Sequence, residues 1–225
     1  MITLDESLDP ACLPLAWLLG RWEGAGVGQW PDGSGYRFGQ ELVIGHDGRA
    51  FLAYESASWV LTEDGTPTGP GPRETGYLRP VAPIRADAGR SDADPDPDPD
   101  RDPDGHDTEL LLAHHDGIVE LYLGRRTGAR LELATDAVVR TAAAPGRAAA
   151  HRLYGLVEGD LLWAWDAGDR KRMAAVMSAR LRRVGDAAGP AVPPGLVGLT
   201  GRAGVPGVPG VPDQSDPAGP GGLPA

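Results

Sequence analysis

Hydrophobic and polar residues alternate with a period of two along most of the chain between Gly20 and Val184, which is the pattern of β-strands that bury one face. In the segment Met173–Val184, for example, the Met and Leu residues share one face, while Ser178 and Arg180 lie on the other. Turn-forming Asp, Pro and Gly residues separate the segments. The pattern predicts eleven strand segments, which are Gly20–Trp30, Tyr36–Gly45, Phe51–Leu61, Glu74–Ala82, Glu109–His114, Ile118–Arg125, Arg130–Ala134, Ala137–Thr141, His151–Val157, Leu161–Asp166 and Met173–Val184.

Such a series of short antiparallel strands fits either a sandwich or a closed barrel. A closed barrel leaves no strand edge exposed, and short connections place each strand beside its neighbour in the sequence. We therefore predict an all-β fold, an antiparallel up-and-down β-barrel of about ten strands. The apolar run Pro10–Leu19 precedes the first strand, and Pro14 limits it to a short N-terminal helix or turn that could cap the barrel.

Two stretches carry too little apolar surface to offset the entropy of ordering them. They are the acidic insert 86–107, with its repeated Asp-Pro dipeptides, and the Gly/Pro-rich tail 186–225. We expect both stretches to be disordered. The chain would then hold one barrel domain, residues 1–185 with the insert inside it, followed by the tail. Without the two stretches roughly 160 residues remain, which is the usual size of one domain.

The net charge of −11 is concentrated in the insert. Between Asp87 and Asp107 there are nine Asp and two Arg residues, a net charge of −7, which leaves −4 for the rest of the chain. This balance argues against a nucleic-acid partner, because phosphates require a basic surface. A calcium site is another interpretation of the insert. Alternating Asp-Pro holds a chain extended, however, whereas a calcium loop folds around its ion.

Cys12 is the only cysteine, so no disulfide forms within the chain, which fits a reducing compartment. The apolar neighbours of Cys12 predict a buried thiol. No segment is long and apolar enough to span a membrane, and no signal peptide is visible at the N-terminus. We therefore expect a cytoplasmic protein without a membrane partner, whereas the sequence leaves its oligomeric state open.

One face of the first predicted strand consists of glycine and tryptophan, at Gly20, Trp22, Gly24, Gly26, Gly28 and Trp30. Glycine weakens a strand unless the strand bends or another group approaches it closely. A barrel uses both effects, because its corners bend and a ligand cavity needs wall positions without side chains. Two interpretations therefore stay open, a wall that faces a ligand and simple curvature. In both of them Trp22 fills the end of the barrel.

A family resemblance starts from the same strand, where seven residues match the GxWxGxG motif of the nitrobindin family: Gly20, Arg21, Trp22, Glu23, Gly24, Ala25 and Gly26. Further segments follow in the family order, among them FGQELVIGHDGRAFLAYESASW, ELLLAHHDGIVELYLG and RLYGLVEGDLLWAWDA. Over most of Leu13–Val184 the chain therefore resembles the nitrobindins. The resemblance implies a lipocalin-like or fatty-acid-binding-protein-like β-barrel that holds ferric haem b, binds nitric oxide and isomerises peroxynitrite to nitrate.

Three positions depart from the family pattern. Nitrobindins carry the iron-ligating histidine in a segment that is missing here, where Val176 continues directly into Met177. A haem needs a strong proximal donor, usually an imidazole, and the thioether of Met177 is a weak and soft ligand. Asp32 stands where the family has a distal Thr, and Pro145 stands where it has a Lys. The resemblance therefore implies that Asp32, Pro145 and Met177 mark a degenerate former haem site, so that no haem cofactor is expected.

No other chemistry is visible in the sequence. The five histidines lie at expected turns, at strand ends or in the insert, and none has the close spacing of metal ligands: His46, His106, His114, His115 and His151. Phosphate-binding loops and nucleophile elbows are absent from the sequence. We therefore predict neither a metal site nor a catalytic residue.

Three functional hypotheses remain. We favour a haem-free binding module that is not an enzyme, with a barrel that is empty, filled by its own side chains or occupied by a small apolar ligand. The alternative is a ferric-haem protein, a peroxynitrite isomerase or nitric oxide binder that uses a substitute iron ligand. The third is an interaction protein that uses the acidic insert or the VPGVPGVP sequence of the tail.

Overall fold

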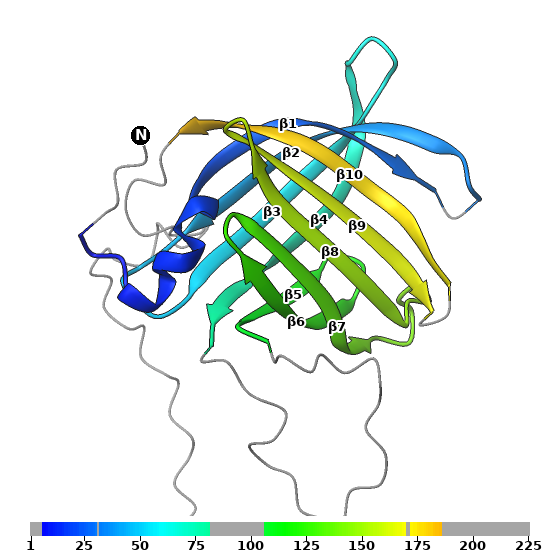
Figure 1. The fold of residues 1–225 in the computed structure, drawn as a ribbon. Coiled ribbons are helices and arrows are strands. Elements are labelled where there is room, and N and C mark those ends of the chain that lie inside the picture. Colours follow the sequence, from blue (N-terminus) through cyan, green and yellow to red (C-terminus); the bar gives the residue numbers. More distant parts are fainter. Residues whose placement is uncertain (1–5, 31, 82–105, 170–171, 186–225) are drawn as a thin grey trace, which may run out of the picture. The chain divides into compact units, whose positions relative to one another are not determined.

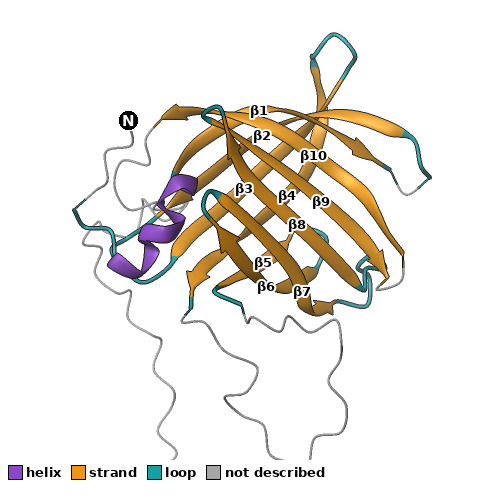
Figure 2. Ribbon diagram, in the orientation of Figure 1, coloured by secondary structure: helices purple, strands orange, loops and turns teal. Residues whose placement is uncertain are grey.

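The computed structural model describes residues 6–30, 32–81, 106–169 and 172–185 of the 225-residue chain (Figure 1). Strands make up most of the described chain, together with one short helix (Figure 2). The strands are β1 (Gly20–Gln29), β2 (Gly35–Gly45), β3 (Leu52–Leu61), β4 (Pro67–Pro80), β5 (Thr108–His114), β6 (Ile118–Thr127), β7 (Arg130–Arg140), β8 (Ala149–Val157), β9 (Asp160–Asp169) and β10 (Arg172–Gly185).

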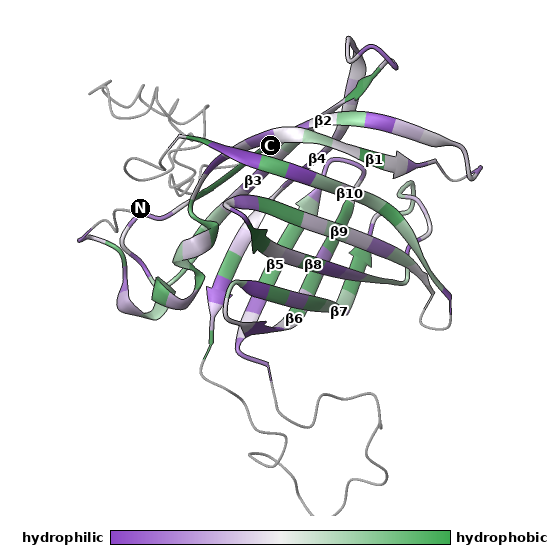
Figure 3. Ribbon diagram, turned by 45° about the horizontal axis from the view of Figure 1, so that its top comes forward, coloured by the Kyte–Doolittle hydropathy of each residue, from purple (hydrophilic) through white to green (hydrophobic). Residues whose placement is uncertain are grey.

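The ten strands close into one barrel, in which each strand pairs antiparallel with its sequence neighbours and β1 pairs with β10. The predicted up-and-down barrel is therefore confirmed. Hydrophilic and hydrophobic residues alternate along the strands (Figure 3), so that one set faces the interior and the other faces outward. Among the described residues, no helix is long and apolar enough to cross a membrane.

Two of the eleven predicted strand segments are one strand. Arg130–Ala134 and Ala137–Thr141 both belong to β7, which runs without interruption to Arg140. Its pairing with β6 shifts register at Asp136, where Leu121 pairs with Ala137 and Tyr122 pairs with Thr135. This β-bulge adds one residue to the strand and so breaks the period of two. The sequence pattern was therefore wrong about the boundary, because a bulge resembles a turn.

The other clear difference lies in β4, which begins at Pro67 and not at the predicted Glu74. Its first half pairs with the end of β3, where Trp59 pairs with Pro70 and Leu61 pairs with Pro67, and the register shifts twice along this stretch. Proline is tolerated in a sheet at such irregular positions. Because this half of β4 lacks apolar alternation, the sequence pattern did not reveal it.

The helix η1 (Pro10–Leu18) covers one end of the barrel (Figure 1), as expected for the apolar N-terminal run. It is a 3-10 helix with Pro14 inside it, and its residues Leu15 and Leu18 are fully buried. Trp22 of β1 is also fully buried, and its indole Nε1–H donates to the carbonyl oxygen of Leu18 at 2.8 Å. The Arg183 guanidinium lies over the Trp22 ring at 4.1 Å. Trp22 therefore fills this barrel end, as predicted.

The glycine face of β1 is covered by aromatic side chains of the neighbouring strand β2. A Cβ atom at Gly26 would lie 2.4 Å from the Phe38 ring, and one at Gly28 would lie 2.4 Å from the Tyr36 ring. Glycine is therefore required here for close approach. The approaching groups belong to the barrel itself, since at Gly26 the Ser178 carbonyl oxygen of β10 would lie still closer, at 2.2 Å. Tyr36 in turn stacks on Trp30 at 4.2 Å between ring centroids.

Two sequence expectations lie wholly or mostly outside the described residues. They are the disorder of the acidic insert, of which only His106 and Asp107 are described, and the disorder of the tail 186–225. The division into a barrel domain and a tail stays a prediction for the same reason. The cytoplasmic location also stays a prediction.

Candidate functional site

The end of the barrel away from η1 differs sharply from the capped end. Strand order sets its level, because in this up-and-down barrel the end of β5 and the starts of β6 and β8 lie opposite the start of β1, where η1 packs. His114 ends β5, Glu120 lies near the start of β6, and Arg152 lies near the start of β8. Towards this end the interior holds a set of charged and phenolic side chains, which we call the polar cluster: Glu74, His114, Glu120, Tyr122, Arg147 and Arg152.

The centre of the polar cluster is an ion pair between β8 and β4. The Arg152 side chain is 1% exposed and the Glu74 side chain 10%. Arg152 donates through Nη1 to Oε2 of Glu74 at 3.0 Å and through Nη2 to Oε1 at 2.5 Å. Such two-point pairing of a guanidinium with a carboxylate is strong and directional. Two phenols complete the surroundings, because Arg152 Nε donates to the Tyr122 hydroxyl at 3.1 Å and Tyr54 donates to Glu74 at 3.2 Å.

A second carboxylate, Glu120 of β6, is fully buried and accepts from two side chains. The Tyr122 hydroxyl donates to its Oε2 at 2.6 Å, and His114 Nε2 lies 2.7 Å from the same oxygen. The other ring nitrogen of His114, Nδ1, lies 3.4 Å from Glu74 Oε1. His114 therefore bridges the two buried carboxylates, and both of its nitrogens face a carboxylate oxygen.

A second guanidinium, that of Arg147, comes from the segment between β7 and β8 and lies over the cluster. Its guanidinium lies over the Trp165 ring at 4.5 Å from the centroid. Its Nη1 is 3.4 Å from Glu120 Oε1, and its Nη2 is 3.8 Å from Asp116 Oδ2. The Arg147 side chain is 12% exposed, so it covers this end of the polar cluster from the solvent side.

The charges in the cluster perturb one another. Burial acts to raise the pKa of Glu120, but hydrogen bonds from His114 and Tyr122 and the charge of Arg147 outweigh it and lower that pKa to about 2. Burial likewise acts to raise the pKa of Glu74, but the Arg152 guanidinium outweighs this effect, so that the pKa of Glu74 is lowered. The pKa of Tyr122 is raised, chiefly by burial. Near neutral pH the cluster therefore holds two ionised carboxylates among protonated phenols.

The three sequence-predicted former haem positions do not come together. Asp32 lies in the exposed turn after β1, where its Oδ1 accepts from the Ser34 hydroxyl at 2.6 Å and from the Ser34 backbone N–H at 2.9 Å, and this bonding lowers its pKa. Pro145 lies exposed between β7 and β8, and its carbonyl accepts from Arg140 at 3.5 Å. Met177 alone faces the interior, where it is 7% exposed.

The inner faces of the described strands do not offer haem iron a strong ligand, and the buried His46 lies outside the strands, directly after β2. All five histidines are described, and only His114 lies on the inner face of a strand, with both nitrogens held by carboxylates. Burial raises the pKa of the Cys12 thiol to about 11, and this residue belongs to the buried side of η1. Tyr54 and Tyr154 also have raised pKa values, mainly through burial, and stay phenols rather than phenolates. These donors do not fit a haem ligand set.

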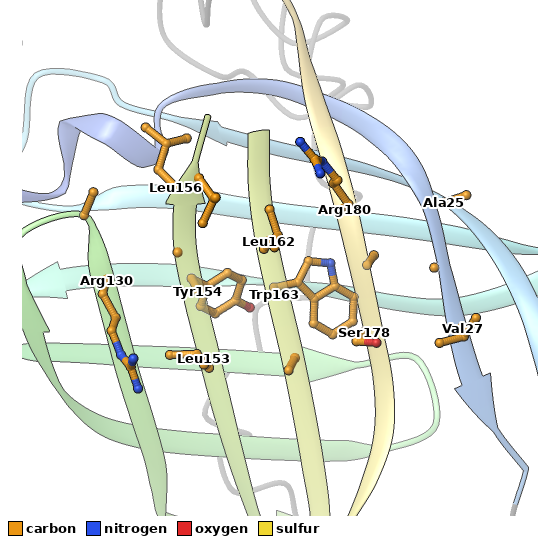
Figure 4. Close-up of a pocket in the computed structure, with 16 residues that line it drawn as sticks. Ala25, Val27, Arg130, Leu153, Tyr154, Leu156, Leu162, Trp163, Ser178 and Arg180 are labelled. Atoms are coloured by element: carbon orange, nitrogen blue, oxygen red, sulfur yellow. The ribbon is translucent and has the colours of Figure 1, made fainter. Parts of the chain in front are cut away.

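Among the described residues, no group of three or more His, Cys, Asp or Glu side chains could hold a metal ion. An apolar cavity of about 670 Å³ lies elsewhere, beside strands β8, β9, β10 and β1 (Figure 4). Its lining consists mainly of residues whose place in the strand alternation puts them on the outer face, including Val27, Leu153 and Leu162. This cavity is therefore separate from the polar cluster.

A closed antiparallel barrel with a helix over one end and a buried polar cluster at the other defines the class of this protein. It is an up-and-down β-barrel of the size that encloses either a small ligand or its own side chains. Residues 11–183 match the family model of the THAP4-like, heme-binding beta-barrel domain. The chain belongs to this family, which confirms the resemblance to the nitrobindins seen in its sequence.

Individual relatives agree with this assignment. A ferric nitrobindin-like protein of Kineococcus radiotolerans is 47% identical, over 76% of this chain and 92% of that protein. A peroxynitrite isomerase of Leifsonia xyli subsp. xyli is 38% identical, over 81% of this chain and 99% of that protein. Among solved structures, the crystal structure of Rv2717c from M. tuberculosis superposes with a TM-score of 0.59 at 28% identity, covering 78% of this chain and 98% of that one.

Sequence reasoning missed most of the polar cluster. A signal for it exists in the strand alternation, because Glu120 has the same parity as Ile118 and Tyr122 and so stands on an apolar face. Arg152 likewise has the parity of Ala150 and Tyr154. A charged residue on a buried face requires a partner. The sequence does not show which partner, since Arg152 and Glu74 are 78 residues apart.

Proposed function

We propose that this protein is a haem-free member of its family and acts as a binding module for a small ligand. The observation that carries the proposal is the position of His114. It is the only histidine on the inner face of a strand, and its Nε2 and Nδ1 lie 2.7 Å and 3.4 Å from Glu120 and Glu74. To bind iron, this imidazole would have to give up one of these carboxylates, which would then lose one of its partners inside the barrel.

The hairpin between β9 and β10 supports the same proposal. Asp169 pairs with Arg172, so only residues 170 and 171 separate the two strands. Neither strand contains a histidine. At the end of the barrel away from η1, this side of the wall is therefore a nearly continuous hairpin. This supports the proposal that the chain lacks the segment which, as the sequence resemblance implies, carries the iron-ligating histidine in nitrobindins.

The polar cluster also bears on the kind of ligand. The sequence led us to expect an apolar ligand inside the barrel. Such a ligand would have to lie beside Arg147, Arg152 and two ionised carboxylates, and burying apolar surface against charges removes water that stabilises them. The described interior therefore favours a ligand that carries polar or charged groups of its own.

Haem content tests the proposal directly. The protein would be produced in cells supplied with haem precursor, next to the 38%-identical peroxynitrite isomerase of Leifsonia xyli subsp. xyli as a positive control. We expect that relative to retain haem, and this protein to be purified with far less than one haem per chain. Stoichiometric haem in this protein, lost in the His114→Ala variant, would overturn the proposal.

A peroxynitrite isomerase activity is the second candidate function, because several relatives that are 38–43% identical carry that name. It requires haem bound through a substitute ligand. With haemin supplied, the decay of peroxynitrite and the yield of nitrate would be compared with free haemin. We expect no acceleration beyond that of free haemin, and a clear acceleration that needs the folded chain would favour this second function.

A further inference from the structure

The surroundings of the Arg147 guanidinium have the composition of a cation-binding site. One wall is the face of Trp165, 4.5 Å away, and two carboxylates, Glu120 and Asp116, point at the same guanidinium. An aromatic face and carboxylate oxygens are the two groups that proteins use to recognise organic cations. Both Glu120 and Trp165 are at least nine-tenths buried, so the walls of this site belong to the barrel interior.

Arg147 occupies this site loosely. Its distances of 3.4 Å to Glu120 and 3.8 Å to Asp116 exceed the ~2.7–2.9 Å of a good charge-assisted hydrogen bond. Arg147 Nη1, Glu120 Oε1 and Asp116 Oδ1 are buried atoms without a hydrogen-bond partner among the described residues. Arg152, by contrast, is bound to Glu74 at two points. The backbone between β7 and β8 thus holds the Arg147 side chain short of the best geometry.

The charge balance decides which ligand fits once Arg147 moves away. Arg152 and Glu74 neutralise each other, and Glu120 and Asp116 are then left with two negative charges next to an aromatic face. An anion would be repelled from such a site, and a neutral apolar molecule would leave the buried Oε1 of Glu120 without a hydrogen-bond donor. A planar cation with several N–H donors would satisfy the carboxylate oxygens and stack on Trp165 at the same time.

We propose that the site between Trp165, Glu120 and Asp116 binds a small organic cation with a guanidinium or amidinium group, and that Arg147 is its intramolecular occupant. This inference deepens the proposed function, since it names the ligand class of a haem-free barrel. An external cation that is free to move closer takes the place of the tethered Arg147 side chain. Arg147 therefore lowers the apparent affinity for such ligands.

The test uses methylguanidinium as the probe, at constant ionic strength, and follows the Trp165 indole N–H by two-dimensional NMR. A Trp165→Phe variant assigns that signal. We expect methylguanidinium to shift it saturably in the Arg147→Ala variant, with at least tenfold tighter binding than in the unaltered protein. The matched control is Arg130→Ala, which removes an exposed arginine paired with Glu132 at 2.7 Å and should bind like the unaltered protein.

Two further variants keep the test decisive. In the Arg147→Ala background, Glu120→Gln should weaken methylguanidinium binding at least tenfold. Asp116→Asn, which changes a residue at the rim, serves the same purpose if the first variant does not fold. The proposal is wrong if Arg147→Ala shows no saturable shift, or if sodium nitrate shifts Trp165 more strongly than the cation. Neither result touches the haem-free proposal, which depends on haem content alone.

Discussion

Both ends of this barrel hold buried side chains, but different kinds of interaction stabilise the two ends. At the end that η1 covers, Trp22, Leu15 and Leu18 are fully buried, and the interior is closed mainly by apolar packing, together with the indole hydrogen bond of Trp22 and the Arg183 guanidinium over its ring. At the other end, Arg152 and Glu120 are almost as inaccessible, but they are held by ion pairs and phenols. Apolar packing tolerates many substitutions of similar volume, whereas a buried charge depends on one specific partner.

The largest expected effect comes from breaking the pair between Arg152 and Glu74. The Arg152→Ala variant leaves the Glu74 carboxylate buried without its cation, which should lower the free energy of unfolding by about 3–5 kcal/mol. Urea denaturation followed by tryptophan fluorescence measures it. The double variant Arg152→Met with Glu74→Met removes both charges and should recover most of the loss. If the single variant lowers the free energy of unfolding by less than about 1 kcal/mol, the pair contributes less to stability than its geometry indicates.

The acid sensitivity of the charged end comes next. The pKa of folded Glu120 is lowered to about 2, from an ordinary value of 4.5. The ionised form is therefore favoured by folding, and its contribution is complete above about pH 4.5 and is lost as the pH falls towards 2. The loss amounts to at most about 3 kcal/mol. Unfolding measured at several pH values should show a shallower decline in Glu120→Gln than in the unaltered protein, and parallel declines would contradict the assignment.

At the capped end a milder effect is expected. The Trp22→Phe variant keeps an aromatic ring but loses the hydrogen bond to Leu18 and part of the contact with Arg183, at a cost of about 1–2 kcal/mol. The control is Trp30→Phe, because the Trp30 ring is 42% exposed and stacks on Tyr36. Thermal unfolding compares the two variants. Equal losses of stability in the two variants would mean that the buried Trp22 contributes no more than the exposed Trp30.

The smallest effect is expected for an exposed ion pair, in contrast to the buried one. Arg79 pairs with Glu109 at 2.9 Å, but its side chain is 52% exposed. Solvent and salt screen such a pair, so the Arg79→Ala variant should change the free energy of unfolding by less than about 1 kcal/mol. Denaturation at low and high salt measures this change. A loss comparable to that of Arg152→Ala would remove the contrast between the two kinds of pair.

The sequence predicted the capped end better than the charged one, for a physical reason. Trp22 and the apolar run before β1 follow local rules of period and packing, and the structure confirms them. The sequence left the glycine face of β1 open between a ligand-facing wall and curvature, and the structure shows close approach of the barrel's own atoms there. The polar cluster joins Glu74 and Glu120 to Arg152 across the barrel, and no local pattern encodes such pairing. The β7 boundary failed in the same way, because a bulge depends on the partner strand.

The alternation of inward and outward residues along the strands did contain information about the polar cluster. Glu120 and Arg152 occupy inward positions, and each could have been recognised as a buried charge in need of a partner. Arg147 carried no such clue, because it lies outside the strands and its position depends on how the backbone between β7 and β8 folds back. The predicted positions Asp32, Pro145 and Met177 came from the family resemblance, and their role in haem loss stays a prediction.

The central claim is that the end of the barrel away from η1 is filled by its own charged side chains and does not ligate haem iron. A haemin titration tests this claim most directly. The Soret absorbance of this protein would be followed next to that of the Leifsonia xyli subsp. xyli relative. We predict a broad, unsaturable band like that of free haemin for this protein. A sharp band that saturates at one haem per chain would contradict the claim.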